Sequence, residues 1–264
     1  MKYTKIFLVH LCTLLIFAAC SKDERSAFTI DAPGKANKYG GGFKAKDFRL
    51  KTIKNTITYS TSLSTIPIEE SYELIYNNRG EVERINKTAI YDDLIRESYY
   101  LAYFKGARMD SITGNSISGS GPLFSGFKYK GNRIVEVLFH SGYGEPERKT
   151  FEYDRKGNLL NGLNGLHFIY DEKDLLAKIV YPIEHFSAFF SYEETPNPLY
   201  IENLHLFFVY GNLSELCYSK WNIAVKKQGL EVITHQNSYD ELGRLKTKNY
   251  SEGIASFHIE FSYH

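Results

Sequence analysis

Two stretches of the chain, Phe151–Leu160 (FEYDRKGNLL) and Ser238–Thr247 (SYDELGRLKT), share one pattern: Tyr and Asp, two further residues, then Gly, a polar residue and Leu. The Asp side chain can hydrogen-bond the backbone two residues on, and Gly supplies the positive φ that closes a short hairpin loop with a bulge. The Leu then begins a returning strand. The pattern therefore predicts a β-hairpin turn and not a catalytic motif.

The same unit recurs along the chain. YELIYNNRGEV, FSGFKYKGNRI and HFIYDEKDLL are close copies, YLAYFKGARM, FFSYEETPNP and FFVYGNLSEL are looser ones, and the half-unit IEFSYH ends the chain. Gly stands four residues after the Tyr at Gly80, Gly157 and Gly243, whereas HFIYDEKDLL has Asp174 there. The spacing of 17 to 29 residues indicates an internal repeat of irregular period, and the tyrosines that end the units are Tyr76, Tyr103, Tyr129, Tyr153, Tyr170, Tyr192, Tyr210, Tyr239 and Tyr263.

The residue two positions before these tyrosines is apolar in eight of nine copies, with Asn237 as the exception. A spacing of two places both residues on one face of a strand, and polar residues such as Glu152 lie between them. We therefore predict a mainly β fold: an antiparallel meander of repeated hairpins, curled into an open or partly closed barrel-like sheet. A membrane-spanning barrel is the alternative, but charged residues in its strands would then face hydrocarbon.

One segment departs from this rhythm. Residues 199–216 contain the apolar stretch Leu204–Tyr210, which fits a strand or a helix equally well, because periodicity does not distinguish the two at this length. The stretch follows Pro198, and we favour one short helix or a loop insertion here.

The first 19 residues are predicted to be a signal peptide. Lys2 and Lys5 precede the apolar run Ile6–Phe17, which is too short to span a bilayer comfortably and is followed by two alanines. Cys20 comes next, and FAAC resembles the lipobox of bacterial lipoproteins, in which the signal is cut before the Cys and the thiol is acylated. We therefore expect Cys20 to be the lipid attachment site; the alternative is an ordinary cleaved signal.

Residues 20–46 are polar and contain Gly40–Gly42, which predicts a flexible tether, followed by a single repetitive β domain at 47–264. Ser21–Glu24 (SKDE) resembles the surface-export signal of Bacteroides-type lipoproteins. This resemblance implies a lipid-anchored protein of the outer membrane exposed at the cell surface, with a periplasm-facing position as the alternative.

The composition excludes some classes of partner and chemistry. Acidic and basic residues are interleaved and the net charge is +1, so no basic stripe is available to bind nucleic acid. Once Cys12 leaves with the signal and Cys20 carries lipid, Cys217 is the remaining thiol, which excludes an internal disulfide. Its apolar neighbours favour a buried structural role over a nucleophile.

No catalytic, metal or cofactor site is predicted. The histidines after the signal lack the spacing of metal ligands, and the Ser/Gly-rich Gly114–Gly126 lacks nucleophile and phosphate-loop motifs, which favours a loop between strands. Adjacent carboxylates such as Asp92 and Asp93 point to opposite faces of a strand, so they form no acid/base pair by themselves. The tyrosines would most simply be core, since Phe and Leu share their face; an exposed aromatic face for sugars or peptides is the alternative.

YDELGRL and YDRKGNL are similar to the YD repeats of Rhs-type and teneurin-type surface proteins. The combination of lipobox, tether, irregular Tyr–Asp–Gly hairpins and a late FFVYGNLSELCYSKW segment resembles a family of uncharacterised Bacteroides-type outer-membrane lipoproteins with a porin-like β fold. That family implies no catalytic residues. We therefore expect a non-enzymatic surface lipoprotein that binds a glycan or a protein, with an assembly scaffold or a glycan-acting enzyme as alternatives. Its ligand and oligomeric state are not encoded in these motifs.

Overall fold

Strands that follow one another along the chain pair antiparallel, except at the two places where the chain passes from one sheet to the other, so the predicted meander is confirmed. The computed structural model describes residues 49–264 except 61–64, 117–118, 141–143, 184, 202, 209–212 and 214, and all of these belong to one compact unit. The predicted signal peptide, Cys20 and the tether lie outside the described residues.

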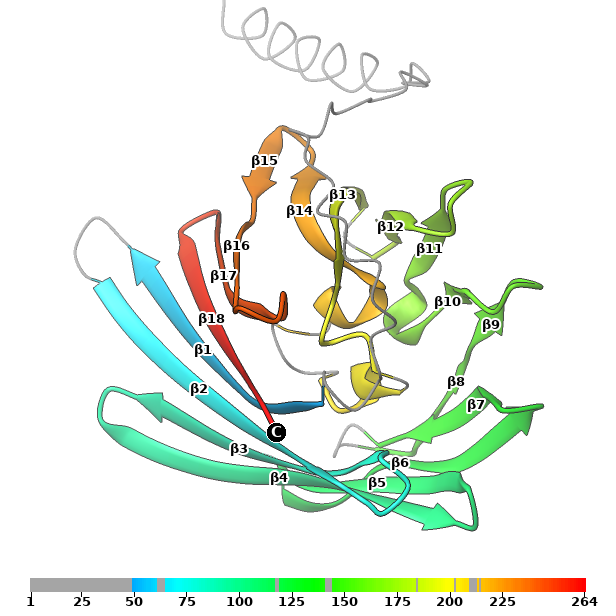
Figure 1. Cartoon of the computed structure of the whole chain (residues 1–264). Coiled ribbons are helices and arrows are strands. Elements are labelled where there is room, and N and C mark those ends of the chain that lie inside the picture. The colour runs from blue at the N-terminus through cyan, green and yellow to red at the C-terminus, as the bar shows by residue number, and fades with distance from the viewer. Residues whose placement is uncertain are drawn as a thin grey trace, which may run out of the picture. The chain divides into compact units, whose positions relative to one another are not determined.

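The larger of two sheets contains both ends of the described chain, because the last strand pairs with the first (Figure 1). Its order is β16 (Gln236–Tyr239), β17 (Leu245–Glu252), β18 (Ala255–Tyr263), β1 (Leu50–Ser60), β2 (Thr65–Tyr76), β3 (Val82–Tyr91), β4 (Leu94–Lys105), β5 (Arg108–Ser116), β6 (Gly119–Lys130), β7 (Arg133–Phe139) and β8 (Glu147–Thr150).

The second sheet continues the first at two places where the chain passes between them. Its order is β15 (Glu231–Thr234), β14 (Trp221–Gln228), β13 (Phe186–Pro196), β12 (Leu176–Tyr181), β11 (His167–Tyr170), β10 (Leu159–Asn161) and β9 (Glu152–Tyr153). Only Phe151 separates β8 from β9, and only His235 separates β15 from β16. The two sheets do not close into a barrel, which agrees with the predicted open arrangement.

The core lies between the inner faces of the two sheets. Alternate residues such as Ile53, Leu74 and Ile85 of the first sheet are fully buried, as is Ile179 of the second. Because side chains alternate between the faces of a strand, the residues between them remain on the outer surface.

The described residues of the segment 197–220 lie between the sheets and include the short 3₁₀ helices η3 (Leu204–Leu206) and η4 (Glu215–Tyr218) (Figure 1). A further 3₁₀ helix, η2 (Leu163–Gly165), precedes β11. The prediction of a short helix or loop insertion is thus confirmed, whereas the prediction that FFVYGNLSEL is a hairpin unit is wrong: Phe207 and Phe208 are buried in a turn after η3. The apolar side chains of this segment pack in the interior of the fold and do not alternate along one face of a strand.

Two further sequence predictions were wrong. Gly114–Gly126 is not a loop, because β5 and β6 run through it with only residues 117–118 between them. In β4 the aromatic residue that ends the unit on the inner face is Phe104 and not Tyr103: Phe104 packs on the core, as does Ala102 two residues before it, and Tyr103 is exposed.

The alternation of strands gives the molecule two rims. The Tyr–Asp rim carries the turns 77–81, 106–107, 131–132, 154–158, 171–175 and 240–244, and the opposite rim carries 92–93, 162–166, 182–185, 229–230 and 253–254.

Candidate functional site

The Tyr–Asp turns are closed by hydrogen bonds of their own. The N–H of Asp154 donates to the Asn158 carbonyl at 3.0 Å, and the Asp154 carboxylate accepts from the N–H groups of Gly157 and Asn158 at 2.6 and 2.8 Å. Burial disfavours the ionised carboxylate of Asp154, but these hydrogen bonds hold its pKa below its usual value. Asn77, Asp171 and Asp240 accept equivalent backbone hydrogen bonds in their turns.

The fourth residue after the Tyr has positive φ in each of these turns, +83° at Gly80, +100° at Gly157, +60° at Asp174 and +74° at Gly243. Asp tolerates this region better than most residues, which explains how Asp174 replaces Gly. The motif is therefore confirmed as a turn, and its carboxylates are occupied in shaping the backbone.

Four of the tyrosines that end the units close the same rim. The hydroxyls of Tyr76, Tyr129 and Tyr263 donate to the carbonyls of Leu50, Met109 and Leu245 at 2.6–2.8 Å, and each carbonyl lies at the start of the preceding strand. Tyr192 donates in the same way to Leu176. Burial raises the pKa of Tyr76 to about 12, so the phenol stays a donor. The rings pack against the core, which makes these tyrosines structural.

Arginines cover the outer ends of these rings. The guanidinium groups of Arg49, Arg108 and Arg244 lie 4.6–5.1 Å from the ring centroids of Tyr76, Tyr129 and Tyr263. Such contacts contribute about 0.5–1 kcal/mol at exposed sites. The Tyr–Asp rim is thus a repeated structural device.

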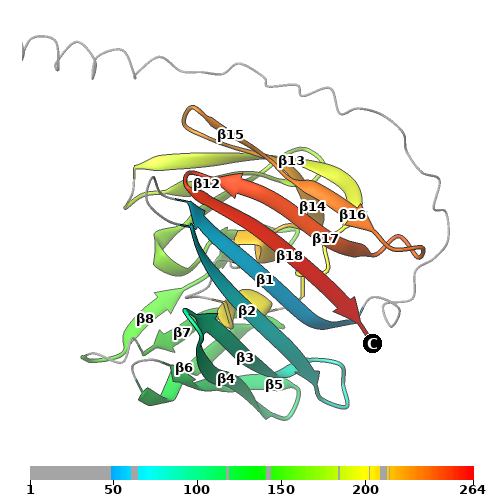
Figure 2. The same ribbon diagram turned by 90° about the vertical axis from the view of Figure 1, so that its left-hand side faces the viewer.

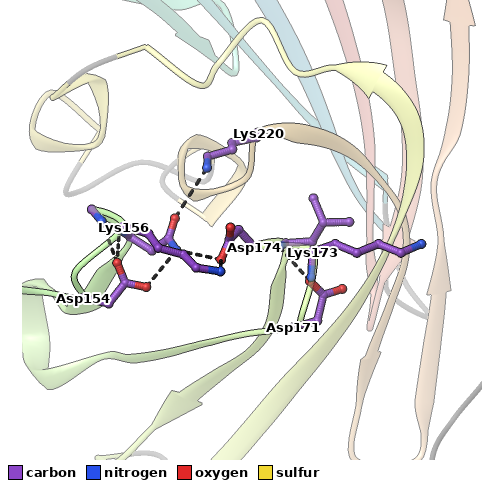
Figure 3. Close-up of polar contacts among 9 residues, drawn as sticks. Asp154, Lys156, Asp171, Lys173, Asp174 and Lys220 are labelled. Atoms are coloured by element: carbon purple, nitrogen blue, oxygen red, sulfur yellow. Dashed lines mark hydrogen bonds and ion pairs between the residues drawn. The ribbon is translucent and has the colours of Figure 1, made fainter.

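Neighbouring turns are also linked to each other (Figure 3). The Asn158 side chain donates to Asp154 at 2.9 Å, while Lys156 pairs with Asp174 at 2.7 Å across to the next turn. Lys220, from the segment between the sheets, reaches the Asn158 side-chain oxygen at 3.5 Å. The three acidic residues labelled in Figure 3 thus stabilise the turns, and no three His, Cys, Asp or Glu side chains among the described residues are placed to hold a metal ion.

A buried ion cluster attaches the interior segment to both sheets. The Lys226 ammonium lies 2.8 Å from Glu215 and 3.1 Å from Glu252, and Tyr181 donates to Glu215 at 2.6 Å. Burial disfavours the Lys226 charge, but the two carboxylates raise its pKa above the usual value, so it remains a cation. Removing one partner from such a cluster leaves a buried charge unpaired, which typically costs about 3–5 kcal/mol.

Lys248 and His235 are buried nearby on the inner face. Burial lowers the pKa of Lys248 to about 7, and its ammonium donates to the Ile223 carbonyl at 3.0 Å. Burial, with the charges of Lys248 and Lys226, lowers the pKa of His235 to about 2, so the imidazole is neutral; it packs on Tyr250 at 4.5 Å. Both groups are 95% or more buried, which keeps them from contact with a substrate.

The outer face of β1, β16, β17 and β18 carries a groove of about 480 Å³, a volume typical of small-molecule sites. Figure 2 looks onto these strands. The lining contains no Asp, Glu, Lys or Arg side chain, and its polar members are Thr56, Thr58, Thr234, Gln236, Asn249, Ser251, Ser256 and His258.

Several of these groups are already oriented by hydrogen bonds. Asn249 and His258 bond side chain to side chain at 2.5 Å, and Ser251 and Ser256 do so at 2.9 Å. Each pair lies across β17 and β18 in register. Hydroxyl, amide and imidazole groups held in rows can donate to and accept from an uncharged polar ligand.

The groove lies where the two sheets separate. β17 pairs with β16 only as far as Asn249, and β15 pairs with β14, so Tyr250–Glu252 and Glu231–Thr234 face each other with no strand pairing between them among the described residues. The opening lies where the chain passes from β15 to β16 at His235, whose N–H still donates to Ala224 of β14 at 2.8 Å. The groove is therefore a consequence of the chain passing from one sheet to the other.

The residues singled out in the sequence lie elsewhere. Cys217 is buried and donates to the Leu213 carbonyl at 3.3 Å, and burial raises the pKa of its thiol, as expected of a structural cysteine. His205 is in aromatic contact with Phe151 and Tyr218. The groove was missed because its residues are ordinary outward-facing strand positions, and alternation alone identifies them only as exposed.

No protein-family model and no curated protein matches the sequence. The fold is similar to that of a porin-like protein from Bacteroides uniformis, with a TM-score of 0.56 and 10% identity over 81% of this chain and 98% of the other. A DUF1329 family protein from Desulfovibrio piger covers 81% and 84% of the two chains at 9% identity, but its TM-score of 0.21 carries no argument. The first similarity shows a shared fold, which agrees with the porin-like β fold implied by the resemblance.

The described part of the chain contains no helix with the length and apolar character needed to cross a membrane.

Proposed function

We propose that this protein is a non-enzymatic lipoprotein of the outer membrane, anchored through Cys20, whose groove binds an uncharged glycan at the cell surface. The observation that carries the ligand class is the lining, in which rows of Thr, Ser, Asn and Gln side chains stand on rigid strands. Sugar hydroxyls require such neutral donors and acceptors, and orientation before binding lowers the entropy cost. The FAAC and SKDE motifs support the anchor and its exposure.

The glycan is tested on an array of neutral and acidic glycans, followed by titration calorimetry with the best ligand. Asn249→Ala should weaken binding about ten-fold, because one ligand hydrogen bond contributes about 1–1.5 kcal/mol. Asn86→Ala is the matched control: Asn86 also lies on the outer face and bonds a neighbouring strand's side chain, Glu73, but lies outside the groove. Equal losses in both variants, or binding of acidic glycans alone, would contradict the proposal.

An extended peptide is the second candidate, because the facing edges of β15 and β17 lack strand partners in the described structure. A peptide bound between them would use its backbone, so its affinity would depend little on side chains at alternate positions. Methylating the backbone nitrogens of a selected peptide should then abolish its binding. A glycan bound to the side-chain rows would not depend on backbone hydrogen bonds of this kind.

Anchoring is tested separately. The mature protein should have the mass of an acylated N-terminal Cys20, and Cys20→Ala should abolish fatty-acid incorporation. Protease added to intact cells distinguishes the two orientations, since only a surface-exposed domain is cleaved. An unacylated mature protein would contradict the anchor without affecting the groove.

A further inference from the structure

The rim opposite the Tyr–Asp turns exposes an unusual share of apolar side chains. Thirteen large apolar residues are exposed among the described residues, and seven of them lie at this rim. Leu230 is fully exposed at the β14–β15 turn, and Ile254 is 64% exposed at the β17–β18 turn. Single exposed aliphatic residues are ordinary, but their concentration at one end of a sheet indicates a contact surface.

The hairpins at this rim are joined into one structure. The Gly253 N–H donates to the Glu231 carboxylate at 2.8 Å, and the Ser60 N–H donates to the Ile254 carbonyl at 2.9 Å. These bonds join the β14–β15 hairpin to the β17–β18 turn, and that turn to the end of β1. We call the apolar side chains at these hairpins that lie outside the groove, Ile66, Leu230 and Ile254, the aliphatic crest.

The acidic side chains beside the crest bond to other groups of the protein. Glu231 accepts from Gly253, and Glu252 pairs with Lys226 at 3.1 Å. The tips of β14–β15 and β17–β18 lie on the same side of the molecule (Figure 2). Leu230 and Ile254 are the most exposed apolar side chains at these two tips.

We propose that the aliphatic crest rests in the interface of a lipid bilayer. Aliphatic residues on separate hairpin tips enter a fluid apolar phase without needing a complementary surface, and partial insertion at the boundary of headgroups and acyl chains is sufficient for interfacial binding. On the next hairpin Asp92 and Asp93 precede the exposed Leu94 and Ile95. This places that tip at headgroup level, where the carboxylates stay in water.

The chain outside the described residues is long enough for this contact. The inference rests on the proposed lipid at Cys20, and the described chain begins at Arg49, beside the Tyr–Asp rim. The 28 residues between them reach about 95 Å when extended, whereas the 11 residues of β1 extend about 36 Å from rim to rim. A lipid anchor at one end of this segment therefore permits the opposite rim to lie on the membrane.

The test uses the full mature chain, acylated and reconstituted into phosphatidylcholine vesicles. An environment-sensitive fluorophore is attached to Leu230→Cys or, as the matched control, to Leu242→Cys, an exposed leucine at the Tyr–Asp rim. Cys217 is buried and does not compete for the label. We expect nitroxide-labelled lipids to quench the fluorophore at 230 at least two-fold more than at 242, and aqueous iodide to show the reverse order.

Three results would overturn the proposal. The fluorophore at 230 could be as accessible to iodide as that at 242, which would leave the crest in water. It could be shielded from iodide without lipid quenching, which would show that protein covers the crest. Equal lipid quenching at both positions would show proximity to the bilayer without orientation. Glycan binding measured on the same samples is independent of all three outcomes.

Discussion

The Tyr–Asp rim and the opposite rim join the same strands but are held together differently. At the Tyr–Asp rim, Tyr76, Tyr129, Tyr192 and Tyr263 donate to the backbone of the preceding strand, and Asn77, Asp154, Asp171 and Asp240 accept backbone N–H groups. At the opposite rim, short turns expose Leu230 and Ile254. The comparison indicates that one rim serves stability and the other serves contact.

The largest expected effect is that of Gly157→Val at the Tyr–Asp rim. A Cβ at Gly157 would lie 1.9 Å from the Arg133 guanidinium nitrogen, and φ is +100°. Backbone strain and displacement of Arg133 should together lower the free energy of unfolding by about 3 kcal/mol, measured by urea denaturation. Gly243→Val controls for strain alone, because nothing lies within 4 Å of its Cβ position at φ +74°. Equal losses would show that the Arg133 contact adds nothing.

The tyrosine hydroxyls should have the next largest effect. Tyr263→Phe leaves the Leu245 carbonyl without its donor in a partly buried position, and the free energy of unfolding should fall by about 1–2 kcal/mol. Tyr103→Phe is the matched control, because Tyr103 lies near the same rim but is 49% exposed, and it should change stability by less than about 0.5 kcal/mol. A loss in the control equal to that in Tyr263→Phe would contradict a specific role for the rim tyrosines.

These turns could be predicted from the sequence because their chemistry is local. Tyr, Asp and Gly at fixed offsets specify the turn, and alternation of apolar residues specifies the strand faces. The exchange of Tyr103 for Phe104 could not be predicted in the same way, because two aromatic residues are adjacent there and either could end the unit. Ala102 and Phe104 share the inner face of β4, and the register shift that precedes Tyr76 and Tyr239 in their units precedes Phe104 here.

The groove required tertiary structure. Thr56 and His258 are 202 positions apart in the chain, and they become neighbours only because the first and last strands pair. No turn residue marks the place where the chain passes between the sheets at His235. Lys248 and His235 look like surface residues in a sequence, but they are buried against β14: Lys248 donates to the Ile223 carbonyl, and the His235 N–H donates to the Ala224 carbonyl.

Acid should distinguish the capping aspartates. Because hydrogen bonds hold the folded pKa of Asp154 and Asp240 below the unfolded value, each contributes stability that is present above about pH 4 and is lost as the pH falls through the folded pKa. Asn77 caps its turn with an amide, so Asp154→Asn with Asp240→Asn should keep stability within about 1 kcal/mol at pH 7 and unfold less steeply between pH 4 and 2. Asp110→Asn gives the effect of losing one exposed carboxylate, to be compared with each single variant, and an unchanged acid slope in the double variant would contradict the role of the caps.

The smallest expected effect is that of Leu230→Ser in the aliphatic crest. The side chain of Leu230 is fully exposed, so its replacement removes no buried area and should change the free energy of unfolding by less than about 0.5 kcal/mol. Leu245→Ala at the start of β17 removes a leucine that is 1% exposed, and it should cost about 2–5 kcal/mol. If thermal denaturation showed that Leu230→Ser costs as much as Leu245→Ala, the crest would be part of the fold. If Leu230→Ser leaves the free energy of unfolding unchanged, Leu230 does not stabilise the fold. An apolar side chain that is exposed to water without stabilising the fold is best explained by a contact outside the protein, which here is the proposed bilayer.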